Sequence, residues 1–214
     1  MTQIYQNKRA LIDAVIQPDD TVLDIGFFGQ GITAHSTDSA HYLLKKRAKE
    51  VWGVDLEYDD TIVDNPAHYI HGNAETFAID NKFSVIFAGD LIEHLSNPGL
   101  FLETARRHLE AGGRLVMTTP NTFNLFNLTE KLSKDEPTVN PDHTFYFNKK
   151  TLRVLLQKND WELDSVDYLY SLGELHKESW KKKFLNVLYK VLSLWTPKFI
   201  ETLVVVATPK KTSL

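Results

Sequence analysis

The chain has 214 residues, of which 43% are hydrophobic and 24% charged, a composition typical of a soluble globular protein that predicts one domain over residues 1–214. Its net charge of -4 and its pI near 6.1 argue against a general affinity for nucleic acid, which requires a basic surface. Cysteine is absent, which excludes disulfides, thiolate catalysis and cysteine-ligated metal.

The N-terminal segment has the apolar spacing of a short helix, which we predict over residues 4–16. It lacks the long apolar core of a signal peptide, and no run in the chain approaches the roughly 20 apolar residues that span a bilayer. We therefore expect a cytoplasmic protein.

The first predicted strand, residues 21–25, contains one acid, Asp24, and runs directly into a glycine-rich turn that begins at Gly26. A turn of this kind at the end of a first parallel strand is where α/β folds hold nucleotide-like ligands. A carboxylate two residues before the first glycine would repel the pyrophosphate of a dinucleotide, whereas it suits a ligand with a positive end. The leading candidate is S-adenosylmethionine, which carries an ammonium and a sulfonium. The alternative is that the acid and the glycines serve only the geometry of the turn.

Strand-like and helix-like stretches alternate along the rest of the chain. The later strands, which are short and largely apolar, are expected at residues 50–55, 69–71, 83–88, 114–119, 161–169 and 201–207. The later helices are expected from near Ser39 to Lys49, with Thr37 or Asp38 as N-cap, and at residues 98–109 and 149–157. This alternation predicts a mostly parallel α/β sheet with helices on both faces.

A second acid, Asp55, ends the second strand, where it can accept hydrogen bonds from both hydroxyls of a ribose. It could instead cap the acidic loop that follows. The third strand leads into Gly-Asn-Ala-Glu at residues 72–75, where Asn73 and its neighbours can hydrogen-bond an adenine edge or form an ordinary turn. Asp24 and Asp55 together predict a nucleoside site.

Asp90, Glu93 and His94 follow the fourth strand, at the crevice where open α/β sheets bind their ligands. His94 is a candidate general base, and Glu93 is a candidate substrate contact. Two carboxylates and an imidazole at this spacing could also hold a divalent metal, or could only brace the next helix.

Further candidates follow the fifth strand. Asn121 is placed either to contact substrate at the same rim or to cap a helix, and the polar, proline-punctuated stretch up to Asp142 suits a lid over the site. His143 is a second general-base candidate, and Tyr146 is a further substrate candidate. Residues 174–195 interrupt the alternation with a predicted basic amphipathic helix, which could cover the substrate, form a dimer surface or lie on a membrane surface.

In this order the motifs resemble the class I S-adenosylmethionine-dependent methyltransferases. The matching run extends from VLDIGFFGQG through GVDLE and GNAE to FSVIFAGDLIEHLSNPGLFLETARRHLEAGGRLVMTTPN. Its AGDLIEHL and GGRLVMTTPN stretches are similar to the branch that contains ubiquinone-biosynthesis O-methyltransferases. The resemblance implies a Rossmann-like, doubly wound, mostly parallel sheet of seven strands with the last strand antiparallel. The glycine turn departs from the family's acid-x-G-x-G-x-G, because in this chain it is one residue longer and carries two phenylalanines.

The resemblance also implies functional residues, with Asp24 and Gly26 at the methionine end of the cofactor, Asp55 at the ribose, and Asn73 and Ala74 at the adenine. The full set of expected cofactor contacts is Asp24, Gly26, Phe27, Gly29, Asp55, Leu56, Asn73, Ala74, Asp90 and Leu91. In ubiquinone-pathway members an E-x-x-E-H cluster is associated with a divalent metal, and Asp90, Glu93 and His94 occupy those positions here. We nevertheless expect no metal.

The function predicted from these residues is S-adenosylmethionine-dependent O-methylation of a small molecule, with a sugar or a lipid-linked molecule as acceptor. His94 ranks ahead of His143 as the base. The alternative is a non-catalytic nucleoside-binding or scaffold protein on the same fold, with residues 174–195 as its partner surface. A nicotinamide-dependent dehydrogenase fits less well, because Asp24 and the glycine spacing oppose it.

Overall fold

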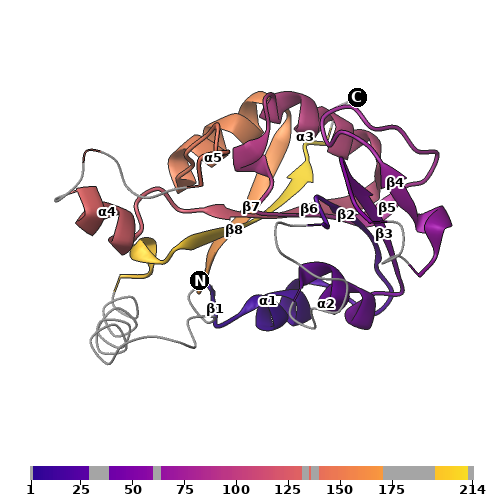
Figure 1. Cartoon of the computed structure of the whole chain (residues 1–214), viewed down its shortest axis with the longest axis horizontal. Coiled ribbons are helices and arrows are strands. Elements are labelled where there is room, and N and C mark those ends of the chain that lie inside the picture. The colour runs from indigo at the N-terminus through magenta and orange to yellow at the C-terminus, as the bar shows by residue number, and fades with distance from the viewer. Residues whose placement is uncertain are drawn as a thin grey trace.

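The computed structural model describes residues 2–28, 39–59, 64–131, 135, 140–170 and 196–211. An eight-stranded sheet forms its centre, with α1 and α2 on one face and α3 and α5 on the other (Figure 1). The strands are β1 Ile4–Tyr5, β2 Thr21–Ile25, β3 Glu50–Asp55, β4 Tyr69–His71, β5 Phe83–Gly89, β6 Leu109–Pro120, β7 Trp161–Leu169 and β8 Thr202–Pro209. Their order across the sheet is β1-β7-β8-β6-β5-β2-β3-β4.

The predicted strand directions are confirmed. β8 runs antiparallel to both of its neighbours, β6 and β7, and the other pairings are parallel. The chain leaves β2 towards β3 on one side, whereas β5 pairs with β2 on the other side. The sheet therefore has its topological switch point between β2 and β5, and in open α/β sheets ligands bind outside the carboxyl ends of the strands at such a point.

The described α-helices are α1 Lys8–Val15, α2 Ala40–Arg47, α3 Pro98–Arg107, α4 Leu125–Lys131 and α5 Lys149–Lys158. Four of them begin at a side chain that accepts a hydrogen bond from a first-turn backbone N–H: Asn7, Ser39, Asn97 and Asn148. The N-cap of α2 is Ser39 itself, whereas the predicted caps Thr37 and Asp38 lie outside the described residues. In the part of the chain that the structure describes, no helix has the length and apolar character needed to cross a membrane.

The prediction of a leading helix over residues 4–16 is wrong at its start. Ile4 and Tyr5 pair in parallel with β7 and form the eighth strand, which is one more than the resemblance implied. The Asn7 side chain accepts from the Ala10 N–H and starts α1 at Lys8. The apolar spacing of residues 4–16 could not by itself show that Ile4 and Tyr5 belong to the edge of the sheet.

The prediction of a helix over residues 98–109 is wrong at its end, because Leu109 and the residues that follow it are not helical. α3 ends at Arg107, and these residues belong to β6, where the pairing register with β5 shifts between Phe83 and Val85. Such an irregularity accommodates extra residues in one strand. Gly112 adopts a φ of 82°, which favours glycine.

The core lies in two layers, one on each face of the sheet. The larger layer contains Phe83, Leu102, Leu156 and Trp161, and the layer under α1 and α2 contains Ile12, Ile16, Leu44 and Val85. β5 contributes to both layers, as its uniformly apolar sequence predicts for a central parallel strand.

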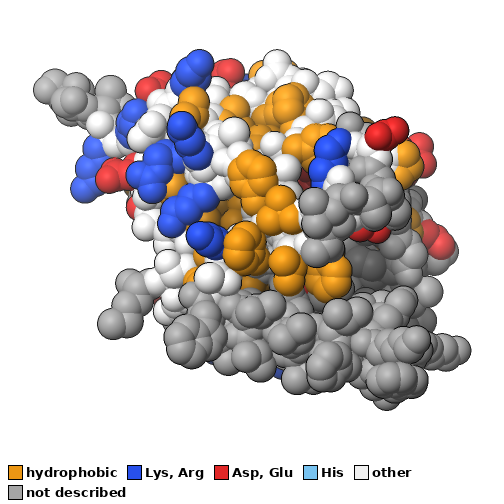
Figure 2. Space-filling model, turned by 90° about the vertical axis from the view of Figure 1, so that its left-hand side faces the viewer, with side chains coloured by type: hydrophobic (Ala, Val, Ile, Leu, Met, Phe, Trp, Pro, Cys, Tyr) orange, Lys and Arg blue, Asp and Glu red, His pale blue; other side chains and the backbone are white. Residues whose placement is uncertain are grey.

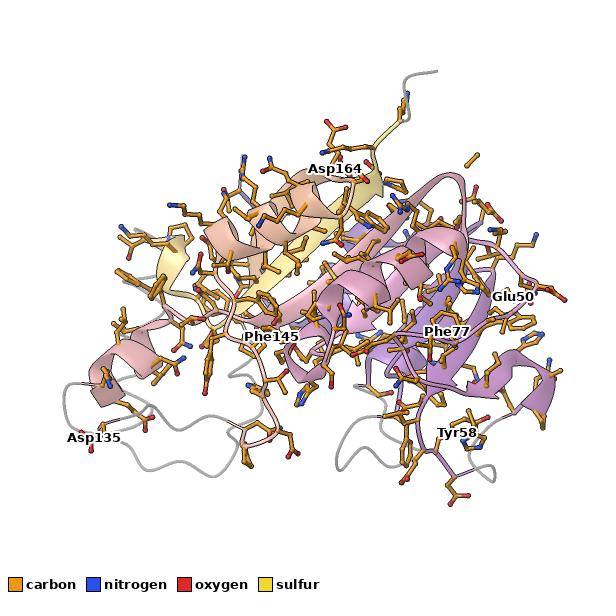
Figure 3. All side chains as sticks on the ribbon, turned by 90° about the horizontal axis from the view of Figure 1, so that it is seen from above. Glu50, Tyr58, Phe77, Asp135, Phe145 and Asp164 are labelled. Atoms are coloured by element: carbon orange, nitrogen blue, oxygen red, sulfur yellow. The ribbon has the colours of Figure 1, made fainter. Side chains whose placement is uncertain are left out.

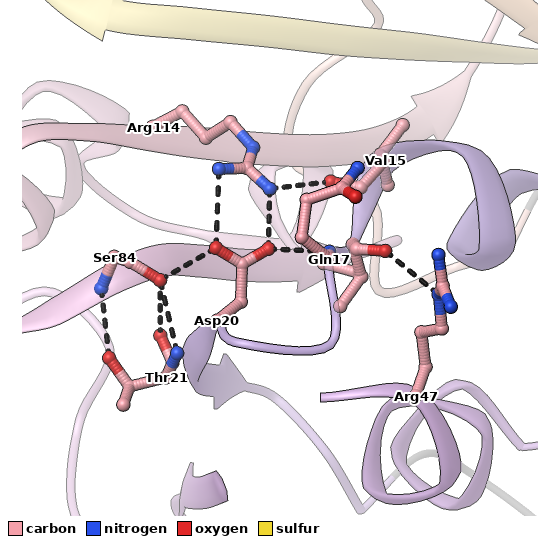
Figure 4. Close-up of polar contacts among 8 residues, drawn as sticks. Val15, Gln17, Asp20, Thr21, Arg47, Ser84 and Arg114 are labelled. Carbon is pink, nitrogen blue, oxygen red and sulfur yellow. Dashed lines mark hydrogen bonds and ion pairs between the residues drawn. The ribbon is translucent and has the colours of Figure 1, made fainter. Parts of the chain in front are cut away.

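A buried polar network ties β2, β5 and β6 together (Figure 4). The Arg114 guanidinium donates to Asp20 Oδ2 at 2.6 Å, Ser84 Oγ donates to Asp20 Oδ1 at 2.8 Å, and the Gln17 N–H donates to Oδ2 at 2.7 Å. Burial by itself would raise the pKa of Asp20, but these donors outweigh burial and lower it. The network holds the three strands together near the amino ends of β2 and β5, opposite the carboxyl ends at the switch point.

Candidate active site

A cavity of about 450 Å³ opens at the carboxyl ends of β2, β3 and β5. Of the cofactor contacts expected from the sequence, the cavity is lined by Asp24, Gly26, Phe27, Asp55, Leu56, Asp90 and Leu91. Its size is that of a small-molecule site, and its place is the switch point of the sheet. The loops that follow the strands lie along this edge of the molecule, and Tyr58 is labelled there in Figure 3.

The first two residues of the glycine turn, Gly26 and Phe27, are held by specific contacts. Gly26 has a φ of 76°, its N–H donates to the Val54 carbonyl at 2.8 Å, and an added Cβ would lie 3.1 Å from Leu91 Cδ1. Phe27 turns inward and packs on the rings of Tyr58 and Tyr69 with centroids 5.1 and 5.2 Å away. Phe27 is thus part of the packing, and Leu91 leaves little room for a side chain at Gly26.

Asp24 is nearly fully buried, and its carboxylate oxygen Oδ2 lies 2.9 Å from Nδ1 of His41. The sequence reasoning missed this partner. His41 lies in the first turn of α2, directly after the long glycine segment, and a polar residue at the start of the helix that follows such a turn is the signal that could have identified it. Lys8, at the start of α1, also lines the cavity and was not expected there.

Asp55 faces the same cavity from β3. The Phe28 N–H donates to its Oδ2 at 2.8 Å. Burial raises the pKa of Asp55 above its ordinary value, and the negative charge of Asp24 adds to that rise, while backbone N–H groups of Phe28, Glu57 and Leu56 oppose it. The two strand-end acids therefore share one electrostatic environment, to which a cationic ligand is complementary.

A second cavity of about 220 Å³ adjoins the first. It is lined by Glu93, His143 and Tyr146, and Asn140 lines both cavities. His94 lines the first cavity, and its ring contacts that of His143 edge-on with centroids 4.6 Å apart. Burial, together with the neighbouring His94, lowers the pKa of His143, although Asp90 and Asp142 oppose that shift. The two predicted base candidates thus lie at the boundary between the cavities.

Glu93 is the most deeply buried acid of the site. Its Oε2 accepts from Thr119 Oγ1 at 2.9 Å, and its Oε1 has no hydrogen-bond partner among the described residues. Burial and, to a lesser extent, the charge of Asp90 raise the pKa of Glu93 to about 8. Near neutral pH this side chain is therefore a carboxylic acid that can donate a hydrogen bond into the second cavity.

A family model described as a methyltransferase domain matches residues 3–166. The chain belongs to this family.

Two curated relatives support the assignment. A protein of Mycolicibacterium smegmatis named probable S-adenosylmethionine-dependent methyltransferase is 31% identical over 141 residues, which is 63% of this chain and 50% of that protein. The mitochondrial ubiquinone biosynthesis O-methyltransferase of Schizosaccharomyces pombe is 26% identical over 112 residues, 50% of this chain and 41% of that protein. The chain thus spans half or less of the length of these two relatives.

Solved structures of S-adenosylmethionine-dependent methyltransferases share the fold. The protein from Methanosarcina mazei superposes with a TM-score of 0.61 at 17% identity and covers 94% of this chain and 98% of its own. The protein from Archaeoglobus fulgidus gives a TM-score of 0.60 at 18% identity, covering 93% of each chain.

Three residues predicted from the sequence to contact ligands are not among those that line the two cavities. Asn73 and Ala74 are not among the residues that line the first cavity: the Asn73 side chain accepts from the Glu75 N–H at 2.8 Å, and Ala74 packs in the core. Their adenine contact stays a prediction. Asn121 is buried, and its amide donates to the carbonyls of Lys198 and Ile200, so its polar atoms hold backbone and do not face either cavity.

The residues that could hold a metal differ in one member from those suggested by the family pattern. Donor atoms of Glu93, His94 and His143 lie within 4.8 Å of one another and could meet a divalent cation, whereas Asp90 is not part of that group. Asp90 instead accepts from Thr118 Oγ1 at 3.0 Å, with a positive φ of 50°. The predicted cofactor contact Gly29 and the predicted helix 174–195 lie outside the described residues.

Proposed function

We propose that this protein transfers a methyl group from S-adenosylmethionine to a hydroxyl oxygen of a small molecule. The observation that carries the proposal is the pair of adjacent cavities that meet at His94 and His143. The larger has acids at two strand ends and suits the cofactor, and the smaller suits the acceptor.

The lining of the larger cavity is complementary to a zwitterionic amino acid attached to a nucleoside. Asp24 offers a carboxylate to the ammonium group, and Lys8 offers an ammonium to the carboxylate. Asp55 accepts from the ribose hydroxyls. When bound there, S-adenosylmethionine supplies a methyl group on a positively charged sulfur.

His94 is the proposed base, as its ring lines the larger cavity and lies against His143 of the smaller one. It accepts the proton of the acceptor hydroxyl as the oxygen gains the methyl group. His143, whose pKa is lowered, stays neutral and does not oppose the charge that forms on His94. Holding both partners in line and excluding water supplies the rest of the acceleration.

The acceptor we propose is neutral. The described residues that line the smaller cavity include no lysine or arginine, and Glu93 is protonated near neutral pH, so nothing there balances a carboxylate or a phosphate. Phe145 and Tyr146 are partly exposed at its rim and offer flat apolar surfaces to a sugar ring. The end of the molecule that carries α4 exposes further apolar side chains beside lysines and arginines, as a lipid-linked acceptor or a membrane surface would require (Figure 2).

A turnover assay tests the proposal. The full chain is incubated with methyl-labelled S-adenosylmethionine and matched pairs of acceptors, such as neutral glycosides and their uronic acids. We expect label in the neutral member of a pair, and His94→Gln should lower kcat about 100-fold while the Kd of the cofactor stays unchanged. His68→Gln, which changes a histidine that pairs with Glu50 away from both cavities, is the matched control.

Cofactor binding without transfer to any acceptor in such a panel would contradict the enzyme proposal. It would favour the alternative, a non-catalytic nucleoside-binding protein on the same fold.

A further inference from the structure

We infer that His41 is a positioning residue that sets the charge available at Asp24, so that binding of a cationic ligand in the larger cavity is coupled to the release of one proton. The inference rests on the proposed function, because it takes S-adenosylmethionine as the ligand. It concerns a contact that the glycine turn and its acid do not by themselves reveal.

The geometry is a continuous polar chain across three elements. His41 Nδ1 lies 2.9 Å from Asp24 Oδ2, and its Nε2 lies 2.9 Å from the Tyr69 hydroxyl. That hydroxyl lies 3.3 Å from Asp64 Oδ1, and Lys45, one turn further along α2, pairs with the other oxygen of Asp64 at 2.5 Å. The chain thus runs from the cavity to the surface, with His41 as the only link to Asp24 among the described side chains.

The donor and acceptor atoms of these hydrogen-bonded side chains allow two protonation states. The carboxylate of Asp24 can only accept, so Nδ1 of His41 carries a hydrogen. Burial, followed by the charge of Asp64, raises the pKa of Tyr69, so its hydroxyl keeps one proton to donate. When the Tyr69 hydroxyl donates its hydrogen bond to Asp64, its oxygen accepts a hydrogen bond from Nε2–H of His41. In this state both ring nitrogens carry a hydrogen, and His41 is a cation. When His41 is neutral, the Tyr69 hydroxyl donates its hydrogen bond to Nε2 instead, and its hydrogen bond to Asp64 is lost.

The surroundings of the ring contain charges of both signs. Asp24 reaches it from β2, and Tyr69 from β4 connects it to Asp64 and Lys45. Phe27 packs on the His41 ring at 4.9 Å and separates it from Tyr58. Beyond Asp24 lies the charge of Asp55, and Lys8 lines the same cavity. Both side chains are largely buried, and among the described side chains His41 is the polar contact of the Asp24 carboxylate.

The ion pair opposes binding of a second cation. A protonated His41 must lose its proton or move away before the ammonium of the ligand can form a full charge-assisted hydrogen bond with the Asp24 carboxylate. Ligand affinity should therefore rise with pH. A neutral His41 still donates through Nδ1 and holds the carboxylate in place, which is why the residue positions Asp24 without blocking it.

Calorimetry of the full chain with S-adenosylmethionine at pH 5.5 and pH 7.2 tests the inference. We expect a lower Kd at the higher pH, by no more than tenfold per pH unit, which is the limit when ligand binding excludes one proton. Titrations at pH 6.2 in two buffers of different ionisation enthalpy should report the release of a measurable fraction of a proton per ligand, and of no more than one. His41→Gln should bind with a Kd that is nearly constant with pH and should release no proton, whereas the control His68→Gln should behave as the unchanged chain does.

A second variant keeps the test decisive if His41→Gln folds poorly. Tyr69→Phe removes the acceptor for Nε2–H of the charged ring, so the pH at which affinity changes should move down while proton release at pH 6.2 decreases. A purely structural role for His41 would lower Tm in these variants without changing proton release. If the unchanged chain binds the ligand with a constant Kd and no proton release, the inference is overturned but the proposed function stands. No binding at either pH would overturn the proposed function itself.

Discussion

Glu93 lies almost fully inside the protein, and only one of its two carboxylate oxygens has a hydrogen-bond donor among the described residues. Its sequence position, one residue before His94, predicts a polar contact with substrate but says nothing of its burial. Burial makes ionisation of the carboxyl group costly. Glutamate is usually a charged surface residue, but Glu93 is for this reason a neutral hydrogen-bond donor.

Glu93→Gln should change how stability depends on pH. The pKa of Glu93 is raised to about 8 in the folded protein, above the value of about 4.3 in an unfolded chain. The folded state therefore holds the proton more tightly, and this stabilisation is complete below pH 4.3 and lost as pH rises towards 8. The advantage of the variant over the unchanged chain in free energy of unfolding should be about 4 kcal/mol larger at pH 8.5 than at pH 5. Urea denaturation at the two pH values measures the gain, and Glu103→Gln on the exposed face of α3 should show none.

Gly26→Ala tests the turn at the same scale, with Gly112→Ala as its matched control. Both glycines have positive φ, but an added Cβ meets Leu91 at 3.1 Å only at Gly26, while nothing lies within 4 Å at Gly112. Both variants should lose about 1 kcal/mol from the left-handed backbone. Gly26→Ala should lose more, and it alone should weaken cofactor binding. Equal losses of stability with unchanged binding in both variants would contradict the role given to Gly26.

At the scale of elements, the ends of β2, β3 and β5 bring Asp24, Asp55 and Asp90 to one rim, because the carboxyl ends of parallel strands share an edge of the sheet. The opposite edge carries the network of Asp20, Ser84 and Arg114. This network holds the relative positions of β2, β5 and β6, and the geometry of the rim depends on it.

Asp20→Asn should destabilise the fold in a pH-dependent way. The pKa of Asp20 is lowered in the folded protein, so its contribution is present above the unfolded value near 3.9 and is lost as pH falls through the lower folded value. We expect a loss of about 2 kcal/mol at pH 7 that shrinks as pH falls through the folded value. Chemical denaturation across this range gives the measurement. Asp19→Asn, in the exposed turn beside it, should have little effect at any pH.

At the scale of the whole molecule, the sequence predicts the parts of the fold that depend on local pattern. The apolar run of β5, the acids at the ends of β2 and β3, and the limits of β7 are read directly from residue order. The pairing of Ile4 and Tyr5 with β7 could not be predicted, because a two-residue edge strand has no periodicity of its own. The regrouping of His143 with Glu93 and His94 and the contact of His41 with Asp24 join residues far apart in the chain, so only the tertiary structure shows them.

The central claim is that the larger cavity binds S-adenosylmethionine through its strand-end acids, and calorimetry with Asp55→Asn tests it most directly. The full chain should bind S-adenosylmethionine and S-adenosylhomocysteine with micromolar Kd, and Asp55→Asn should weaken both about tenfold or more, through loss of charge-assisted hydrogen bonds to the ribose. Asp80→Asn, an exposed acid away from the cavity, should bind as the unchanged chain does. The absence of binding at millimolar ligand, or equal affinity in Asp55→Asn, would contradict the account.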